Sequence, residues 1–70
     1  MYIIQEMQTN NGQTALVPAV VEADRNEAES KFLLASSYAV KSTVEVHTVI
    51  WYDEHGNVID RKFYEHIAES

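Results

Sequence analysis

The chain has 70 residues, of which 46% are hydrophobic and 23% charged, with two glycines, one proline and no cysteine. This composition fits one small globular domain over residues 1–70 and excludes a disordered, collagen-like or disulfide-bonded chain. Eleven acidic against five basic residues give a formal net charge of -6. That sign is wrong for holding nucleic-acid phosphates, so direct nucleic-acid binding is not expected.

A domain of this size has a small core. It buries only about 60% of the surface that its unfolded chain exposes, so the core needs support from elsewhere. Without cysteine, neither a disulfide nor a thiolate metal site can supply that support. The remaining sources are very regular secondary structure and a partner chain.

The chain shows no sign of membrane insertion or export. Residues 1–6 lack the basic start and apolar stretch of a secretory signal. The longest apolar run, residues 15–21, is too short to span a bilayer. We therefore expect a soluble protein of the cytoplasm that does not enter membranes.

A β-hairpin is predicted at the start of the chain. Residues 2–9 and 14–22 are rich in β-formers, and between them Asn11-Gly12 can supply two turn residues with positive φ. A two-residue turn sets the register of the hairpin. The predicted pairs are Thr9 with Thr14, Met7 with Leu16, and Ile3 with Val20.

The two faces of this hairpin are both apolar. One face carries these pairs together with Gln5 and Pro18, and the other carries Tyr2, Ile4, Val17 and Val21. Because proline removes a hydrogen-bond donor from a strand, Pro18 indicates that the second strand is an edge or carries a bulge.

A helix is predicted next, from about Arg25 to about Lys41. Asp24 is followed three residues later by Glu27, the spacing of a capping box, with Asp for the usual Ser or Thr. Lys41 suits the carboxyl end of the helix dipole. The core stripe at helical spacing consists of Ala28, Phe32, Ala35 and Ala39.

A second hairpin is predicted from residues 43–52 and 58–64, with a turn at 53–57. In the first strand Val44, Val46, Thr48 and Ile50 share one face, and Glu45, His47, Val49 and Trp51 share the other. Two registers remain open. A two-residue loop pairs Ile50 with Ile59 and Val46 with Phe63, whereas a glycine bulge pairs Trp51 with Ile59 and His47 with Phe63. The first matches apolar residues better.

These elements predict an α+β fold of the order ββαββ, with one four-stranded antiparallel sheet and one helix packed on one face. The strand order is not determined by the sequence.

No catalytic, cofactor-binding or metal-ligating set is found. Ser36 and Ser37 lie within the predicted helix rather than on a nucleophile elbow, and the two glycines are too far apart for a phosphate loop. The histidines His47, His55 and His66 are scattered, whereas a zinc site needs three or four convergent ligands. We therefore expect a protein that is not an enzyme and binds no cofactor.

The excess of apolar residues points to a partner. One helix covers one sheet face, yet both faces are apolar, and this favours a second covering layer, for which another copy of the chain is the obvious source. The helix offers a second possible surface. The candidate interface residues are Tyr2, Ile4, Val17, Val21 and Trp51 on the sheet, and Leu33, Leu34 and Tyr38 on the helix.

Acidic residues gather at the start of the helix, namely Glu22, Asp24, Glu27 and Glu29. Helix-dipole complementarity and solubility account for such a group. The alternative is an acidic surface that imitates nucleic-acid phosphates and blocks a basic groove on a host protein.

Three segments, residues 1–9, 24–31 and 46–49, resemble small uncharacterised proteins encoded in bacteriophages and prophages of gut bacteria. The resemblance implies a phage or prophage origin and no established activity. Together with the apolar surfaces it favours a non-catalytic interaction module, homodimeric or bound to a phage or host protein. The acidic host-directed inhibitor is the alternative.

Overall fold

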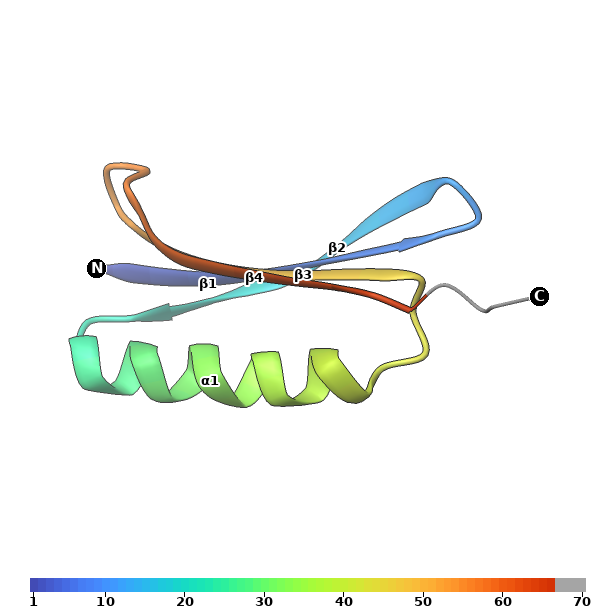
Figure 1. Ribbon diagram of the computed structural model, residues 1–70. Helices are drawn as coiled ribbons and strands as arrows, with labels where there is room; N and C mark the ends of the chain where they lie inside the picture. Colours follow the sequence, from blue (N-terminus) through green and yellow to red (C-terminus); the bar gives the residue numbers. More distant parts are fainter. Residues whose placement is uncertain (67–70) are drawn as a thin grey trace.

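Four strands and one helix follow one another in the computed structural model, which describes residues 1–66 (Figure 1). The strands form one antiparallel sheet in the order β2-β1-β3-β4, and the helix crosses one face of it. The predicted ββαββ fold is thus confirmed. The elements are β1 (Tyr2–Asn10), β2 (Gln13–Glu22), α1 (Arg25–Lys41), β3 (Val46–Asp53) and β4 (Val58–Glu65).

The turn of the first hairpin is the predicted one. Asn11 and Gly12 have φ values of 53° and 76°, as a two-residue turn with both φ positive requires. Thr9 pairs with Thr14 and Met7 with Leu16, so the predicted register holds next to the turn.

A bulge then shifts the register of this hairpin. Ile4 pairs with Val20 and Glu6 with Val17, so two residues of β2, 18 and 19, oppose one residue of β1. Pro18 predicted that the second strand is an edge strand or carries a bulge. The structure confirms both, because β2 lies at the edge of the sheet and has the bulge at residues 18 and 19. The predicted pairing of Ile3 with Val20 is wrong, because the extra residue brings Val21 opposite Ile3 instead.

The helix has the predicted bounds. The Asp24 carboxylate accepts a hydrogen bond from the Glu27 backbone N–H at 3.0 Å, which satisfies one of the free amides of the first turn. Of the predicted stripe, Ala28, Phe32 and Ala39 are buried and Ala35 is half-buried. Ser36 is also buried, and its hydroxyl donates to the Phe32 carbonyl at 2.8 Å.

The core lies between α1 and the middle strands. Ile4, Val49 and Trp51 are at most 3% exposed beneath the helix. The Trp51 and Phe32 ring centroids are 5.7 Å apart, and the Arg25 guanidinium lies 5.2 Å from the Trp51 ring centroid. The face that the helix covers is therefore the one that carries Ile4 and Trp51, which was expected to be uncovered.

The second hairpin has the glycine-bulge register beside the turn and then departs from both registers considered. Tyr52 pairs with Val58 beside the turn, but an irregularity follows, and farther along the strands Ile50 pairs with Arg61. In the turn, the Asp53 carboxylate accepts backbone hydrogen bonds from His55 and Asn57, each at 2.9 Å. The bond from the Asn57 backbone is the main cause of a pKa below the ordinary value for the Asp53 carboxyl.

Candidate interaction surface

The sheet face opposite α1, here called the open face, is not covered by any described element (Figure 1). Directly opposed residues on neighbouring strands share a face, so strand pairing arranges the open face in four rows across β2, β1, β3 and β4. In order along the strands, the rows are Thr14, Thr9, Val46 and Glu65; Leu16, Met7, Thr48 and Phe63; the β2 bulge, Gln5, Ile50 and Arg61; and Val21, Ile3, Tyr52 and Val58.

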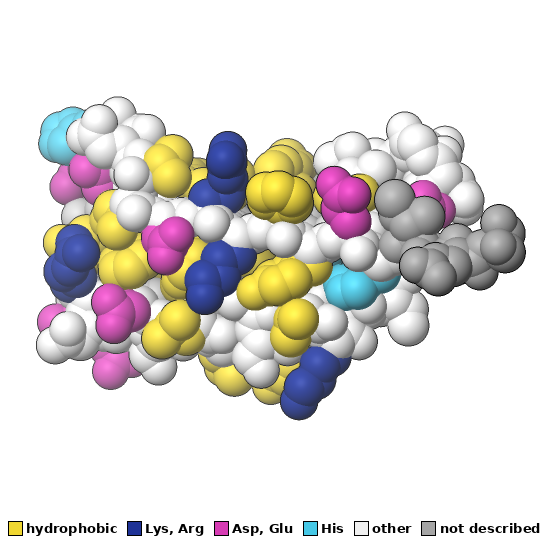
Figure 2. Space-filling view, viewed as in Figure 1, with side chains coloured by type: hydrophobic (Ala, Val, Ile, Leu, Met, Phe, Trp, Pro, Cys, Tyr) yellow, Lys and Arg dark blue, Asp and Glu magenta, His cyan; other side chains and the backbone are white. Residues whose placement is uncertain are grey.

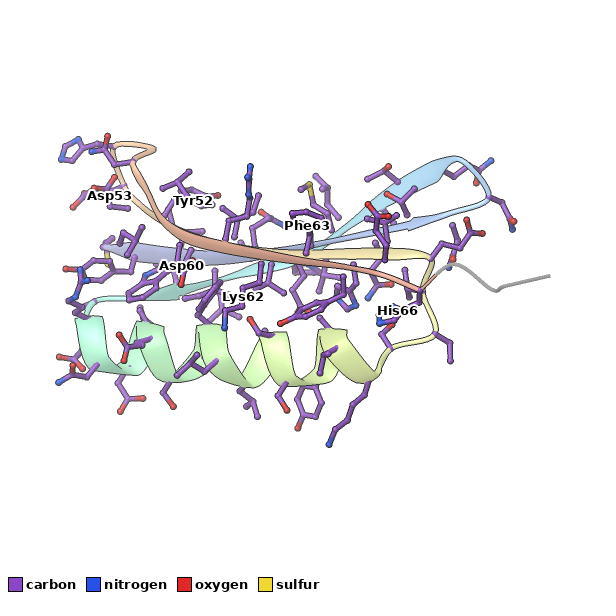
Figure 3. All side chains as sticks on the ribbon, viewed as in Figure 1. Tyr52, Asp53, Asp60, Lys62, Phe63 and His66 are labelled. Carbon is purple, nitrogen blue, oxygen red and sulfur yellow. The ribbon has the colours of Figure 1, made fainter. Side chains whose placement is uncertain are left out.

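The open face is largely apolar. The exposed fractions are 67% for Leu16, 58% for Phe63, 61% for Val58 and 55% for Val21. In Figure 3, Tyr52 and Phe63 point away from the helix, whereas Asp60 and Lys62 point toward it. Figure 2 shows hydrophobic side chains along the same side of the sheet, interspersed with Lys or Arg and Asp or Glu side chains. Large exposed apolar patches are common at interaction sites, so the open face is the candidate interaction surface.

The candidate interface residues fall into three groups. The expectation that Ile4 and Trp51 lie on an uncovered face is wrong, because both are core residues, and Tyr2 packs against that core. Val17 pairs with Glu6 on the helix side of the sheet, and only Val21 reaches the open face, owing to the bulge. On α1, the three predicted residues are exposed, namely Leu33, Leu34 and Tyr38.

Except for Val21, the residues of the open face were assigned to the covered face by the sequence. The narrow alanine stripe of the helix could have corrected this, because a stripe of small side chains leaves room for a large one on the sheet. Trp51 is the largest side chain in the chain, and it fills that room against Phe32. Placing Trp51 beneath the helix assigns the opposite side of each strand to the open face.

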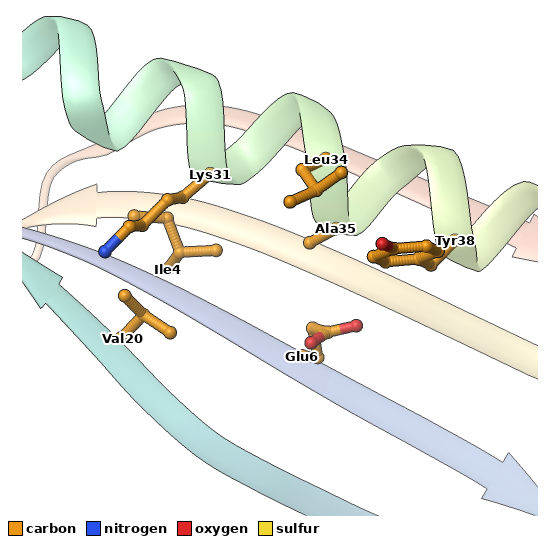
Figure 4. Close-up of a pocket in the computed structure, with 7 residues that line it drawn as sticks. All are labelled: Ile4, Glu6, Val20, Lys31, Leu34, Ala35 and Tyr38. Carbon is orange, nitrogen blue, oxygen red and sulfur yellow. The ribbon is translucent and has the colours of Figure 1, made fainter.

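A shallow groove runs between α1 and the β1–β2 half of the sheet (Figure 4). Its volume is about 280 Å³. Leu34 and Tyr38 form its helix side, and Ile4, Glu6 and Val20 form its floor. Glu6 is engaged there, because its carboxylate lies 3.0 Å from Nε2 of the buried His47. The groove is a minor surface compared with the open face.

The acidic residues at the helix start have structural partners. Asp24 caps the helix, and Glu22 pairs with the Lys31 ammonium group. Glu27 lies in the first turn, where its charge suits the helix dipole, and Glu29 is exposed. Two of the four carboxylates are therefore occupied within the chain.

The histidines lie apart from one another. His47 is in the core, His55 is exposed in the β3–β4 turn, and His66 lies at the carboxyl end of the helix. The two ring nitrogens of His66 are 2.9 and 3.1 Å from the carbonyl oxygens of Val44 and Val40. Within residues 1–66, no three His, Cys, Asp or Glu side chains converge as a metal site would require.

No protein-family model, curated protein or solved structure matches the chain. Across residues 1–66, no helix has the length and apolar character needed to cross a membrane. The open face therefore has to be judged from its own residues, which come from all four strands.

Proposed function

We propose that the chain is a non-catalytic protein-interaction module that works as a homodimer, with the open faces of two copies packed against each other. The observation that carries this proposal is the exposure of large apolar side chains across a sheet face without a helix. An antiparallel sheet that is wet on one side normally carries polar residues there. Here the row of Leu16, Met7, Thr48 and Phe63 crosses the middle of that face.

Two further features support a second copy as the partner. A single helix gives this chain few buried residues, with six hydrophobic side chains in the core of the described part, and small domains commonly gain stability by association. Two sheets packed face to face at a separation of about 10 Å would form a second core. A two-fold dimer buries the same patch on both copies, so a single apolar face on each copy is enough to form a closed dimer.

The acidic inhibitor is the less supported proposal. The Glu22 carboxylate pairs with the Lys31 ammonium group, and the Asp24 carboxylate caps the helix. Two of the four acidic residues of the proposed phosphate mimic therefore already have partners within the fold. The phage or prophage origin and the cytoplasmic location stay predictions from the sequence. A phage or host protein in place of the second copy would use the same open face.

Matched leucine variants test this proposal. Leu16 on the open face is 67% exposed and Leu33 on the helix is 50% exposed, so both leucines can be replaced by glutamine with little effect on the core. Full burial of a leucine contributes about 1.5–3 kcal/mol, and each dimer would lose two such side chains. We expect Leu16→Gln to raise the dimer dissociation constant at least about tenfold.

The control is Leu33→Gln, which should leave the dissociation constant unchanged. Sedimentation equilibrium over a concentration series measures both constants. If Leu33→Gln weakens the dimer and Leu16→Gln does not, the helix rather than the open face is the interface. If neither variant has an effect on a stable dimer, neither surface is the contact.

A further inference from the structure

We infer that the two-fold axis of the homodimer runs across the strands along the row of Leu16, Met7, Thr48 and Phe63, so that Arg61 of each copy pairs with Glu65 of the other. This inference rests on the proposed homodimer and adds its geometry. Arg61 and Glu65 are the only charged side chains in the four described rows of the open face, and they have opposite signs.

The spacing of these two residues defines the axis. Arg61 and Glu65 lie two residues before and two residues after Phe63 on β4, on the same face of the strand. Neither makes an ion pair with another residue in the described range 1–66. An axis in the plane of the interface, perpendicular to the strands at Phe63, exchanges the two positions and so places each charge opposite its complement.

The same rotation matches the other strands. It places each strand above the same strand of the other copy. It also exchanges the row before the axis with the row after it. Ile50 of one copy then faces Val46 of the other, and Gln5 faces Thr9. Apolar residues thus meet apolar ones and polar residues meet polar ones, as a self-complementary surface requires.

The shape of the sheet allows this arrangement. Both hairpin turns rise toward the open side, one at each end of the sheet (Figure 1). The rotation brings the β1–β2 turn of one copy to the end where the β3–β4 turn of the other copy rises. The two turns belong to different halves of the sheet, so they would lie side by side.

Other two-fold axes fit less well. An axis along the neighbouring row, through Ile50 and Arg61, places the two Arg61 guanidinium groups against each other. An axis parallel to the strands sets β4 over β2, so Arg61 faces the bulge and Glu65 faces Thr14. Only the axis through the Phe63 row gives each of the two charges a partner of opposite sign.

Charge reversal at either position tests the inference. In Arg61→Glu and in Glu65→Arg, both inter-copy pairs become like-charged, and we expect the dimer dissociation constant to rise roughly tenfold or more in each. If general repulsion between two negatively charged copies controlled the affinity, the expected outcome would be different. Each substitution changes the charge by two, so Glu65→Arg lowers the magnitude of the net charge from -6 to -4 and would strengthen the dimer if general repulsion dominated.

Mixing the two variants supplies a second measurement. The Arg61→Glu variant has acidic residues at both positions, and the Glu65→Arg variant has basic residues at both. A heterodimer of the two variants therefore has two oppositely charged pairs. In an equimolar mixture, we expect this heterodimer to be at least about tenfold tighter than either homodimer. Native mass spectrometry distinguishes the three species by mass. The double variant Arg61→Glu/Glu65→Arg should recover the affinity of the unmodified chain.

The outcomes separate this inference from the proposed function. If the unmodified chain dimerises and Glu65→Arg strengthens the dimer, or the double variant stays as weak as the single ones, the axis is wrong and the homodimer stands. Heterodimer formation alone would not suffice, because the two acidic side chains of one variant also attract the two basic side chains of the other in other registers of the two open faces. If the unmodified chain is monomeric, the proposed homodimer itself fails.

Discussion

Replacing Trp51 by alanine is expected to unfold the protein or bring it close to unfolding. Trp51 is 3% exposed and contacts Phe32, Tyr2 and Arg25 through its ring. Truncation of a buried tryptophan to alanine costs about 3–5 kcal/mol, and the total stability of a domain is about 5–15 kcal/mol. Chemical denaturation followed by circular dichroism, at one fixed protein concentration, measures the loss.

The neighbouring Tyr52 provides the control. It lies on the open face and points away from the helix (Figure 3), so Tyr52→Ala should leave the helix–sheet core intact. A Trp51→Ala variant with an unchanged denaturation midpoint would contradict the placement of Trp51 in the core. So would a Tyr52→Ala variant that unfolds while Trp51→Ala remains folded.

Replacing Phe63 by glutamine is expected to abolish the dimer at micromolar concentrations. Phe63 is 58% exposed in the single chain, so the substitution removes little from the monomer core. On the proposed axis the two Phe63 rings lie next to each other along the β4 edge of the interface, and a few large, mostly aromatic side chains commonly contribute most of the binding energy. A loss of about 3 kcal/mol raises the dissociation constant about a hundredfold.

Tyr38→Gln is the matched control for this variant. Tyr38 is 65% exposed on the helix, and its replacement should leave the dimer intact. Size-exclusion chromatography with light scattering compares the two variants at equal concentrations. An unchanged dimer in Phe63→Gln, with an unchanged fold by circular dichroism, would exclude the open face as the contact.

The elements of this fold follow from local sequence signals. The Asn11-Gly12 pair favours a tight turn with positive φ wherever it lies between β-formers, and the structure has that turn. Asp24 caps the helix through the Glu27 amide, and such an interaction involves only neighbouring residues. Both features could be predicted because their physical causes lie within a few residues of chain.

The arrangement of the faces depends on distant contacts and could not be predicted in the same way. Both sides of β1 are apolar, so its alternation does not say which side the helix covers. The bulge opposite Gln5 moves Val21 from one face of the sheet to the other, and proline alone does not fix the number of extra residues. The irregularity in β4 changes the second hairpin in the same manner.

The sequence therefore predicted that an exposed apolar face exists, but it assigned most of the residues of that face incorrectly. The sequence indicated a second apolar face, and the structure has exposed apolar residues on the sheet face opposite α1. Of the residues assigned to it, Ile4 and Trp51 form part of the core instead, and only Val21 lies on the open face. The exposed helix residues Leu33, Leu34 and Tyr38 remain an independent surface.

The absolute molar mass in solution, measured by light scattering behind size exclusion over a wide concentration series, tests the homodimer most directly. One chain has a mass of 8.0 kDa. The open-face homodimer predicts twice that mass at high concentration, with a return to 8.0 kDa on dilution or in the Phe63→Gln variant. A well-folded protein of 8.0 kDa at every concentration would contradict it.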